Sequence, residues 1–379
     1  MSTALCAALA ALALALVHAA RMNAWREALR NAGAGGAPEA ATEVEPVSVV
    51  VPARDAAETL VPLLQDLHAQ THRAHMEVIV VDDHSSDGTV ALVEAMRPRW
   101  PDLRLVRLEE AAGKKAALSA GIAAARHGLV LFTDADARCG PDRVAAIARH
   151  RAVHDWDLLV APVRTQGEGL LGLVQVEEQV ALSGAAVGTW AEGAPLIAYG
   201  ANLAVSREAF TAVGGYTGDR WAGGDDVFLL HRLRRHGRPT ALSMDPAMMV
   251  TVEAEPTRGG FLRQRLRWAG KMRGVRLRGA TLAAGSGVLL PWMLLGLSAL
   301  VLRELRLGQG ALFTLGTLCS AWCAWLFPTV AMAGDARRIL FGHAAPLRSA
   351  LALLAFSVLA PLIALASLVV RPRWKGRRV

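Results

Sequence analysis

The clearest candidates for chemistry are two acids that follow the apolar run 130–132. Asp134 and Asp136 lie one residue apart, directly after this run. Carboxylates at the end of a buried strand can hold a divalent cation, because Mg²⁺ and Ca²⁺ prefer oxygen ligands. Paired acids are also common in solvated loops, which is the simpler interpretation of the pair taken alone. The choice depends on which other residues the fold places beside it.

Other charged residues lie next to two further predicted elements, two acids after a strand and a lysine before a helix. Asp82 and Asp83 close the apolar run 78–81, and the turn after them leads into a helix. Asp87 is the best placed of these acids to cap that helix, which leaves Asp83 available for a ligand, with Asp82 as support. Lys114 precedes a helical pattern, where a lysine suits a diphosphate by its charge and by the helix dipole. The alternative is an ordinary surface lysine.

Asp225 and Asp226 form a third acidic pair, placed before the apolar stretch 227–230. A helix that begins there is stabilised by acids in its first turn, so helix capping is one interpretation. The other is general-base catalysis, in which one carboxylate takes a proton from a hydroxyl group. The residues alone leave both interpretations open.

Gln264, Arg267 and Trp268 fall at i, i+3 and i+4, which places them on one face of a helix. The arginine can bind a diphosphate through two hydrogen bonds, and the tryptophan can stack on a sugar. A belt of Arg and Trp beside a membrane is the alternative. Both interpretations hold together if this helix lies at the membrane interface.

The elements that must position these residues alternate between strands and helices. We expect strands at 47–51, 77–81, 103–108 and 129–132, and helices at 57–69, 89–96 and 116–126. This alternation predicts βαβ units and a parallel sheet, in which ligands bind beyond the carboxyl ends of the strands. Pro52, Asp83 and Asp134 lie at such ends, so one crevice can hold all three.

The composition indicates a membrane protein. Hydrophobic residues make up 53% of the 379, and the mean hydropathy is +0.31. Long uncharged segments lie at 3–20, 281–302, 311–333 and 349–370, each close to the roughly 20 residues that a helix needs to cross a bilayer. The four cysteines form no disulfide framework, which fits a cytosolic face. The net charge of +8 gathers beside these segments, so we expect anionic lipid headgroups rather than nucleic acid as its partner.

We expect the chain to divide into an N-terminal transmembrane anchor, a linker, a catalytic domain, a group of membrane helices and a basic tail. These are residues 1–21, 22–45, 46–275, 276–370 and 371–379. A cleaved signal peptide is the alternative for the first segment, but its start carries no basic residue. The arginines after it place the following domain in the cytoplasm. Four spans would put the basic tail outside, so one segment, first of all 281–302, is expected to be re-entrant or interfacial.

Seven stretches, in this order and spacing, resemble the inverting glycosyltransferases of family 2. They are VSVVVPARD (47–55), EVIVVDDHSSDGT (77–89), GKKAALSAG (113–121), FTDADARCGPD (132–142), YGANLAVSREAF (199–210), GGDDVFLLHRL (223–233) and QRLRWAGK (264–271). The resemblance covers residues 46–275. It is closest to the membrane-bound bacterial branch related to cellulose and hyaluronan synthases and to ceramide glucosyltransferase, which shares the Gln-x-x-Arg-Trp motif. It implies an α/β domain with the Rossmann-like GT-A fold, joined here to transmembrane helices, and a nucleotide-diphosphate sugar as the donor.

The resemblance implies a donor site at the strand ends. Asp83 would bind the N3–H of a uracil ring, and Asp134 would face the ribose. Asp136 would hold Mg²⁺ or Mn²⁺, a metal that stabilises the charge of a departing diphosphate. The implied donor-binding residues are Pro52, Ala53, Asp82, Asp83, Lys114, Asp134, Gln264, Arg267 and Trp268, and the implied metal ligands are Asp136 and Asp134.

The resemblance also implies a catalytic base and an acceptor site. The family's base is the last Asp of a Glu-Asp motif, which corresponds to Asp226, while Asp225 replaces the Glu and supports it. Asn202 offers donors and acceptors to sugar hydroxyls, with an Asx turn as its alternative role. Trp268 would form the wall of the acceptor entrance.

We therefore expect a multi-pass protein of the inner (plasma) membrane whose cytoplasmic domain transfers a sugar, first of all from a UDP-sugar, to a lipid or lipid-linked acceptor. The small number of spans favours a single transfer over the alternative, a small processive polysaccharide synthase. An alternative of another class is a non-catalytic scaffold that only binds nucleotide. The intact set of Asp136, Asp226 and the Gln264-x-x-Arg267-Trp268 motif argues against a scaffold.

Overall fold

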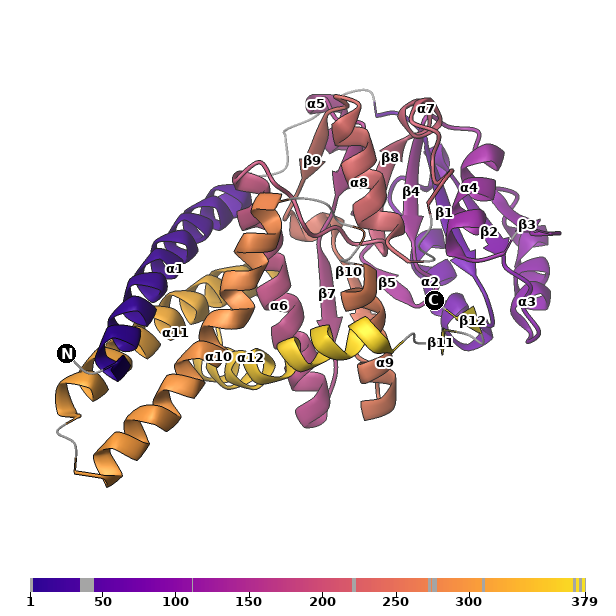
Figure 1. Cartoon of the computed structure of the whole chain (residues 1–379). Coiled ribbons are helices and arrows are strands. Elements are labelled where there is room, and N and C mark those ends of the chain that lie inside the picture. The colour runs from indigo at the N-terminus through magenta and orange to yellow at the C-terminus, as the bar shows by residue number, and fades with distance from the viewer. Residues whose placement is uncertain are drawn as a thin grey trace.

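The computed structural model describes residues 3–34, 44–110, 112–219, 223–271, 274, 278–308, 311–370, 373–374 and 377–378. Parts of the expected linker (35–43), of the last residues of the catalytic domain (272–273 and 275) and of the basic tail lie outside this set. A domain built on a twisted sheet occupies one side of the molecule, and long helices gather on the other (Figure 1).

A seven-stranded sheet forms the centre of the domain, with the order β3-β2-β1-β4-β8-β6-β9. Its strands are β1 (Val47–Ala53), β2 (Met76–Asp82), β3 (Leu103–Arg107), β4 (Leu129–Thr133), β6 (Leu158–Val160), β8 (Asn202–Ser206) and β9 (Thr240–Leu242). Strand β1 runs parallel to β2 and β4, whereas β8 runs antiparallel to β4 and β6. The sheet is therefore mixed. Because β9 pairs parallel with β6, the expectation of a parallel sheet fails only at β8, which opposes the other strands.

Side-chain alternation explains the double-sided core of this sheet. On β1, Val47, Val49 and Val51 pack into one cluster of buried residues and Val50 packs into another. Successive side chains of a strand point to opposite faces, so a nearly continuous apolar strand is buried on both sides. The expected positions of the first four strands are confirmed to within a few residues.

Helices cover both faces of the sheet. The expected helices are confirmed as α2 (Ala57–His68), α3 (Thr89–Met96) and α4 (Lys114–Ala124). On α2, Leu60, Leu63, Leu64 and Leu67 are fully buried, as their helical spacing predicts. The remaining helices of the domain are α5 (Arg143–Val153), α7 (Arg207–Ala212), α8 (Asp225–Arg235) and α9 (Arg258–Lys271), with short 3₁₀ turns at Arg73–His75, Arg97–Arg99 and Pro246–Met248.

A small second sheet joins the segment after Asp136 to the segment before α9. Its strands are β5 (Ala137–Cys139), β10 (Val250–Glu253) and β7 (Val163–Gln166). The central strand, β10, pairs antiparallel with β5 and parallel with β7. This sheet therefore links two of the motifs that the sequence singles out. In the tail, β11 (Arg373–Trp374) pairs with β12 (Arg377–Arg378).

Four helices of the described part are long and apolar enough to cross a membrane: α1, α6, α11 and α12. Their bounds are Thr3–Ala34, Gly169–Ala191, Leu312–Phe341 and Pro346–Val369, and α10 (Arg278–Arg306) lies beside them (Figure 1). Helix α1 continues to Ala34, so the first residues of the segment expected to be a linker are helical. Helix α6 belongs in sequence to the segment expected to be the soluble domain.

Buried ion pairs and close packing hold α6 against the long helices. Glu177 accepts a hydrogen bond of 2.7 Å from Ser349 of α12, and it lies 3.3 Å from Arg337 of α11. A Cβ atom on Gly188 would lie 2.0 Å from the ring of Trp25 on α1, so the absence of a side chain lets these two helices approach. Helix α6 thus connects the sheet domain to the group of long helices.

Candidate active site

The carboxyl ends of β1 and β2 meet, because Ala53 and Asp82 are paired in register. The backbone N–H of Asp83 donates a 2.8 Å hydrogen bond to the carbonyl oxygen of Ala53. Four residues of the expected donor site, Pro52, Ala53, Asp82 and Asp83, are therefore neighbours at this edge of the sheet.

The carboxylate of Asp83 is buried and faces the start of α4. Its Oδ2 accepts a 3.0 Å hydrogen bond from the N–H of Gly113, and its Oδ1 lies 3.2 Å from Nδ1 of His84. The Nη1 atom of Arg54 lies 3.9 Å from the same Oδ2. Gly113 has φ +100°, a left-handed backbone that favours glycine.

Neither Asp82 nor Asp83 serves the start of α3. Asp87 does so, because its carboxylate accepts a 3.0 Å hydrogen bond from the N–H of Thr89, the first residue of α3. It also accepts a 2.9 Å bond from the N–H of Ala57, the first residue of α2. Asp82 accepts a 3.2 Å bond from the N–H of Ser85 and thereby shapes the turn between them. This division agrees with the expectation that Asp87, rather than Asp83, caps the helix.

Lys114 joins the end of β4 to the start of α8. Its Nζ atom lies 2.7 Å from Oδ1 of Asp134 and 3.2 Å from Oδ2 of Asp225. Burial lowers the pKa of Lys114, but these two carboxylates outweigh burial and hold this pKa well above its ordinary value. Burial likewise raises the pKa of Asp225, and Lys114 and Lys271 outweigh that effect and lower it. The ammonium of Lys114 and the carboxylate of Asp225 are therefore charged at neutral pH.

The neighbouring lysine points elsewhere. The Nζ atom of Lys115 lies 2.8 Å from Asp219, and Arg232 binds the other oxygen of that carboxylate at 2.5 Å. Lys115 also lies over the ring of Phe228, 5.0 Å from its centroid. Lys114 is thus the lysine of this pair that reaches the acids at the strand ends.

The Gly200-Ala201-Asn202 stretch contributes its glycine to the site and not its asparagine. A Cβ atom on Gly200 would lie 2.7 Å from Oδ2 of Asp225 and 3.1 Å from Nζ of Lys114. Asn202 is fully buried, where it accepts a 2.9 Å hydrogen bond from Arg143 and donates to the carbonyl oxygens of Pro162 and Met248. Its amide is fully used inside the fold, so the prediction of an acceptor-binding Asn202 is wrong.

Asp225 and Asp226 begin α8, as expected, after Gly224 in a left-handed conformation. Asp226 is buried, and its two carboxylate oxygens lie 3.0 and 2.9 Å from Nζ of Lys271, the last residue of α9. Its Oδ1 also accepts a 2.7 Å bond from the N–H of Val227. Each acid of the pair is therefore matched with a different lysine.

The Gln-x-x-Arg-Trp residues lie on α9 beside a buried ion pair. Arg265 binds Glu178 of α6, with its Nε 2.9 Å from Oε2, and its guanidinium lies 4.6 Å from the ring centroid of Trp268. The Nε2 of Gln264 donates a 3.3 Å bond to Glu255, and Arg267 is half-buried. Arg265 thus fixes α9 against α6, while the end of α9 reaches the acids through Lys271.

The oxygen ligands near Lys114 fit a divalent cation whose coordination is completed by a ligand. Asp134 is partly exposed, and Asp136, two residues further on, is exposed. Within the residues that the structure describes, no three His, Cys, Asp or Glu side chains are grouped closely enough to hold a metal ion. Two carboxylates together with the oxygens of a diphosphate match the way Mg²⁺ binds in nucleotide sites.

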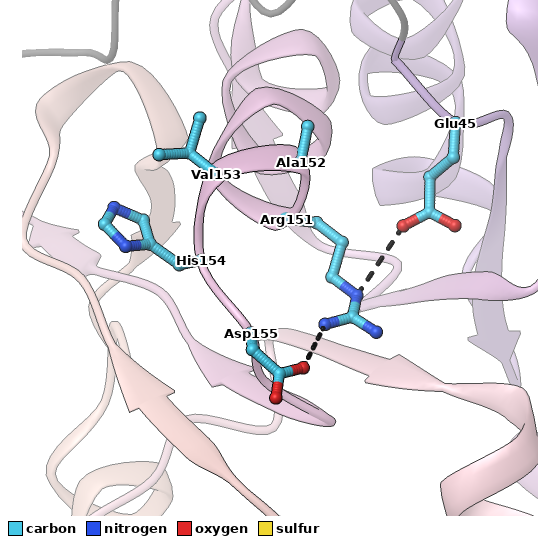
Figure 2. Close-up of a pocket in the computed structure, with 6 residues that line it drawn as sticks. All are labelled: Glu45, Arg151, Ala152, Val153, His154 and Asp155. Atoms are coloured by element: carbon cyan, nitrogen blue, oxygen red, sulfur yellow. Dashed lines mark hydrogen bonds and ion pairs between the residues drawn. The ribbon is translucent and has the colours of Figure 1, made fainter.

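A hollow of about 600 Å³ lies elsewhere, at residues 45 and 151–155. Figure 2 shows Arg151 between Glu45 and Asp155, with His154 pointing away from them. Glu45 precedes β1, so this hollow marks the amino ends of the parallel strands, opposite the acids. It contains none of the expected site residues.

Three residues of the site were missed by the sequence reasoning: Arg54, Gly200 and Lys271. Lys271 follows Arg267 and Trp268 at i+4 and i+3, so its helical spacing was a usable signal. Arg54 and Gly200 belong to stretches that were recognised, but no local pattern distinguishes them from their neighbours.

Residues 48–210 match the family model described as glycosyl transferase family 2. The succinoglycan biosynthesis protein ExoO of Rhizobium meliloti (strain 1021) is 39% identical over 107 residues, which are 28% of this chain and 30% of that protein. The beta-monoglucosyldiacylglycerol synthase of Synechocystis sp. is 28% identical over 214 residues, 51% of this chain and 40% of that protein. The matches therefore span less than half the length of either relative.

A solved structure resembles most of the chain. It is the mannosyltransferase PcManGT from Pyrobaculum calidifontis in complex with GDP-Man and Mn²⁺, with a TM-score of 0.59 at 21% identity, over 93% of this chain and 99% of that one. At this identity the likeness establishes the fold, which is GT-A.

Proposed function

Because residues 48–210 match the family model described as glycosyl transferase family 2, we propose that the chain is a membrane-anchored inverting glycosyltransferase. It transfers a sugar from a nucleotide-diphosphate sugar to a hydroxyl group of a lipid or lipid-linked acceptor. One observation carries the proposal. A continuous line of polar contacts runs from Asp83 through Gly113 and Lys114 to Asp134 and Asp225, at the carboxyl ends of the strands.

The donor lies along this line. Asp83 accepts a hydrogen bond from the base, first of all the N3–H of uracil, while the backbone of Pro52 and Ala53 lines the nucleotide slot. Lys114 follows Gly113 directly, so a diphosphate that extends from the base toward β4 meets its ammonium. On α9, Arg267 provides a second cation for the phosphates, and Gln264 and Trp268 close the sugar side.

Asp226 is the general base of the proposed reaction. It takes the proton of the acceptor hydroxyl as that oxygen forms a bond to the anomeric carbon of the sugar. The bond from that carbon to the diphosphate breaks on the opposite face, and the nucleoside diphosphate leaves with the electron pair. A single displacement of this kind inverts the configuration. Asp225 supports the base by holding Lys114 in place.

Asp136 and Asp134 would hold a divalent cation, Mg²⁺ or Mn²⁺, together with diphosphate oxygens. When bound, such a cation stabilises the negative charge of the leaving group. Lys114 and Arg267 contribute positive charge from the protein, which stabilises the same leaving group.

The acceptor class follows from the long apolar helices. Within the described residues, four helices could cross a membrane, and several of their large apolar side chains are exposed, such as Leu16, Phe327 and Leu365. A lipid or lipid-linked acceptor would present its hydroxyl at this boundary. We place the catalytic domain, residues 46–275, in the cytoplasm, between the anchor at 1–21 and the membrane helices of 276–370.

A screen of radiolabelled nucleotide sugars against a lipid extract of the host tests the proposal. The purified full chain in detergent should move label from one of them, first of all a UDP-sugar, into the lipid fraction when Mn²⁺ or Mg²⁺ is present. It should also hydrolyse that donor slowly without acceptor. An Asp226→Asn variant prepared in parallel serves as the inactive control. If the chain binds UDP but neither transfers nor hydrolyses any donor, a nucleotide-binding scaffold becomes the better account.

A small processive polysaccharide synthase is the second candidate. The name of one relative, a succinoglycan biosynthesis protein, favours it. The same assay separates the two candidates by product length, because a processive enzyme makes long chains early while a single transfer leaves one sugar on each acceptor.

A further inference from the structure

Lys271 engages both carboxylate oxygens of the proposed base. Its Nζ atom lies 2.9 Å from Oδ2 and 3.0 Å from Oδ1 of Asp226. The side chains of Lys271 and Asp226 are only 20% and 9% exposed. Water therefore screens this ion pair weakly.

This pairing is unsuited to catalysis. A carboxylate that receives an ammonium on both oxygens has no oxygen directed freely at an acceptor hydroxyl, and a base must lie within hydrogen-bond reach of the proton that it abstracts. Asp226 can serve as the base only after Lys271 has moved away. Lysine is suited to such a movement, because its ammonium is a compact charge on a flexible four-carbon stem.

The lysine side chain can exchange partners without a movement of α9. Arg265 anchors this helix to α6 through its buried pair with Glu178. Lys271 lies one helical turn beyond Arg267 and Trp268, which places all three on one face. Its ammonium therefore lies on the side of α9 to which we assign the diphosphate.

The charges around Lys271 indicate which group its ammonium binds when it leaves Asp226. The carboxylates of Asp134, Asp225 and Asp226 take part in the ion pairs at this edge of the sheet. Lys114 is divided between two of them, at 2.7 and 3.2 Å. Among the described residues, the ion pair of Lys271 is with Asp226, and its charge acts on Asp225 without an ion pair. A diphosphate adds further negative charge. It therefore attracts Lys271, which is held by one acid, more readily than Lys114, which is held by two.

We propose that Lys271 is a counter-ion shared between Asp226 and the diphosphate of the donor. Without donor it neutralises Asp226. When the donor binds, the ammonium moves to the phosphates and releases the base for the acceptor hydroxyl. The inference rests on the proposed function, and it assigns a phosphate-binding residue beyond the Gln-x-x-Arg-Trp motif.

Titration calorimetry of the full chain in detergent tests this assignment, with UDP and UMP as probes at fixed Mn²⁺ and ionic strength. Lys271→Met should weaken UDP binding about tenfold or more, the loss expected for one hydrogen bond to a charged group, and should reduce the preference for UDP over UMP. Lys271→Arg should keep most of the affinity. Arg263→Met removes an exposed cation from the same helix and should leave UDP affinity unchanged.

A double-mutant cycle isolates the exchange itself. Asp226→Asn releases Lys271 in advance, so it should strengthen UDP binding several-fold in the otherwise unchanged protein. In the Lys271→Met background the same substitution should strengthen binding less, because no lysine remains to be released. A purely repulsive effect of Asp226 on phosphate would give equal gains in both backgrounds.

Equal gains, or a Lys271→Met variant with undiminished UDP affinity, overturn the shared counter-ion and leave the glycosyltransferase proposal standing. Absence of any UDP or GDP binding by the unchanged protein overturns both. If Lys271→Met fails to fold, Asp226→Asn still decides the question, because a fall in its UDP affinity contradicts the release of Lys271.

Discussion

The ammonium of Lys114 lies 2.7 Å from a carboxylate oxygen of Asp134 and 3.2 Å from one of Asp225. One side chain at the start of α4 thereby connects the strand that carries the expected metal ligands to the helix that carries the expected base. The three residues lie far apart in the sequence, and only the fold brings them together. This ion triad is the geometric centre of the proposed site.

Gly200→Ala should disturb this triad without unfolding the protein. The new methyl group would lie 2.7 Å from Oδ2 of Asp225, so the carboxylate must shift. A displacement of about 1 Å in a catalytic site can reduce the rate by as much as ~10²-fold, and we expect a loss of turnover of about tenfold or more. Gly140→Ala is the matched control, because its methyl group would meet nothing within 4 Å. Equal turnover in both variants would contradict the importance of the triad.

Asp83→Ala should weaken UDP binding and leave metal binding unchanged. The variant loses the charged acceptor of a hydrogen bond that the nucleotide base donates, worth roughly 1.5–3 kcal/mol, or about 10- to 100-fold in affinity. Asp87→Ala is its counterpart, because Asp87 serves the start of α3. That variant should lose about 1 kcal/mol of stability and keep its UDP affinity. Unchanged UDP affinity in Asp83→Ala would return Asp83 to a purely structural role.

Asp136→Ala should abolish transfer and most of the metal-dependent gain in donor binding. The described residues contain no group of three potential ligands that could replace it. UDP affinity measured with and without Mn²⁺ checks this, with Asp102→Ala, an exposed acid of a distant loop, as the control. Near-normal turnover of Asp136→Ala without added Mn²⁺ or Mg²⁺ would refute the metal assignment.

Local signals predicted the first half of the catalytic domain well. The strands up to residue 133 are rich in apolar and β-branched residues. In the helices between them, the apolar residues recur at helical spacing. Each element is therefore specified by its own residues. The contact of Asp87 with the start of α3 was also predictable, since a helix cap depends on residues close in sequence. In this half of the domain, the residues within each strand or helix largely determine where that element lies and which face it buries.

The errors concern residues whose partners are distant in sequence. Asn202 resembles a sugar ligand until Arg143 and two carbonyl oxygens are seen to use its amide. Helix α6 lies within the segment expected to be the soluble domain, and Glu177 and Glu178 interrupt its apolar pattern. Their charges are balanced by Arg337 on α11 and Arg265 on α9. Pairings of this kind follow from tertiary structure, which no local pattern reveals.

The roles of the two neighbouring acids Asp225 and Asp226 can be separated by substituting each with asparagine. Asp226→Asn keeps the size and shape of the side chain but cannot accept a proton. Asp225→Asn removes a partner of Lys114 and leaves the proposed base in place. Turnover and UDP affinity, measured on both variants in detergent with saturating donor, separate the two roles.

General-base catalysis is worth about 10²–10⁴-fold, so Asp226→Asn should lose turnover by about that factor, and Asp225→Asn should lose less. Neither should lose UDP affinity, because each substitution removes a negative charge from the neighbourhood of the diphosphate and frees a lysine to bind it. A greater loss of turnover in Asp225→Asn would make Asp225 the base and Asp226 the partner that positions Lys271. If both variants keep their turnover, the two acids serve only to begin α8 and to bind the lysines, and the base must be sought among other residues.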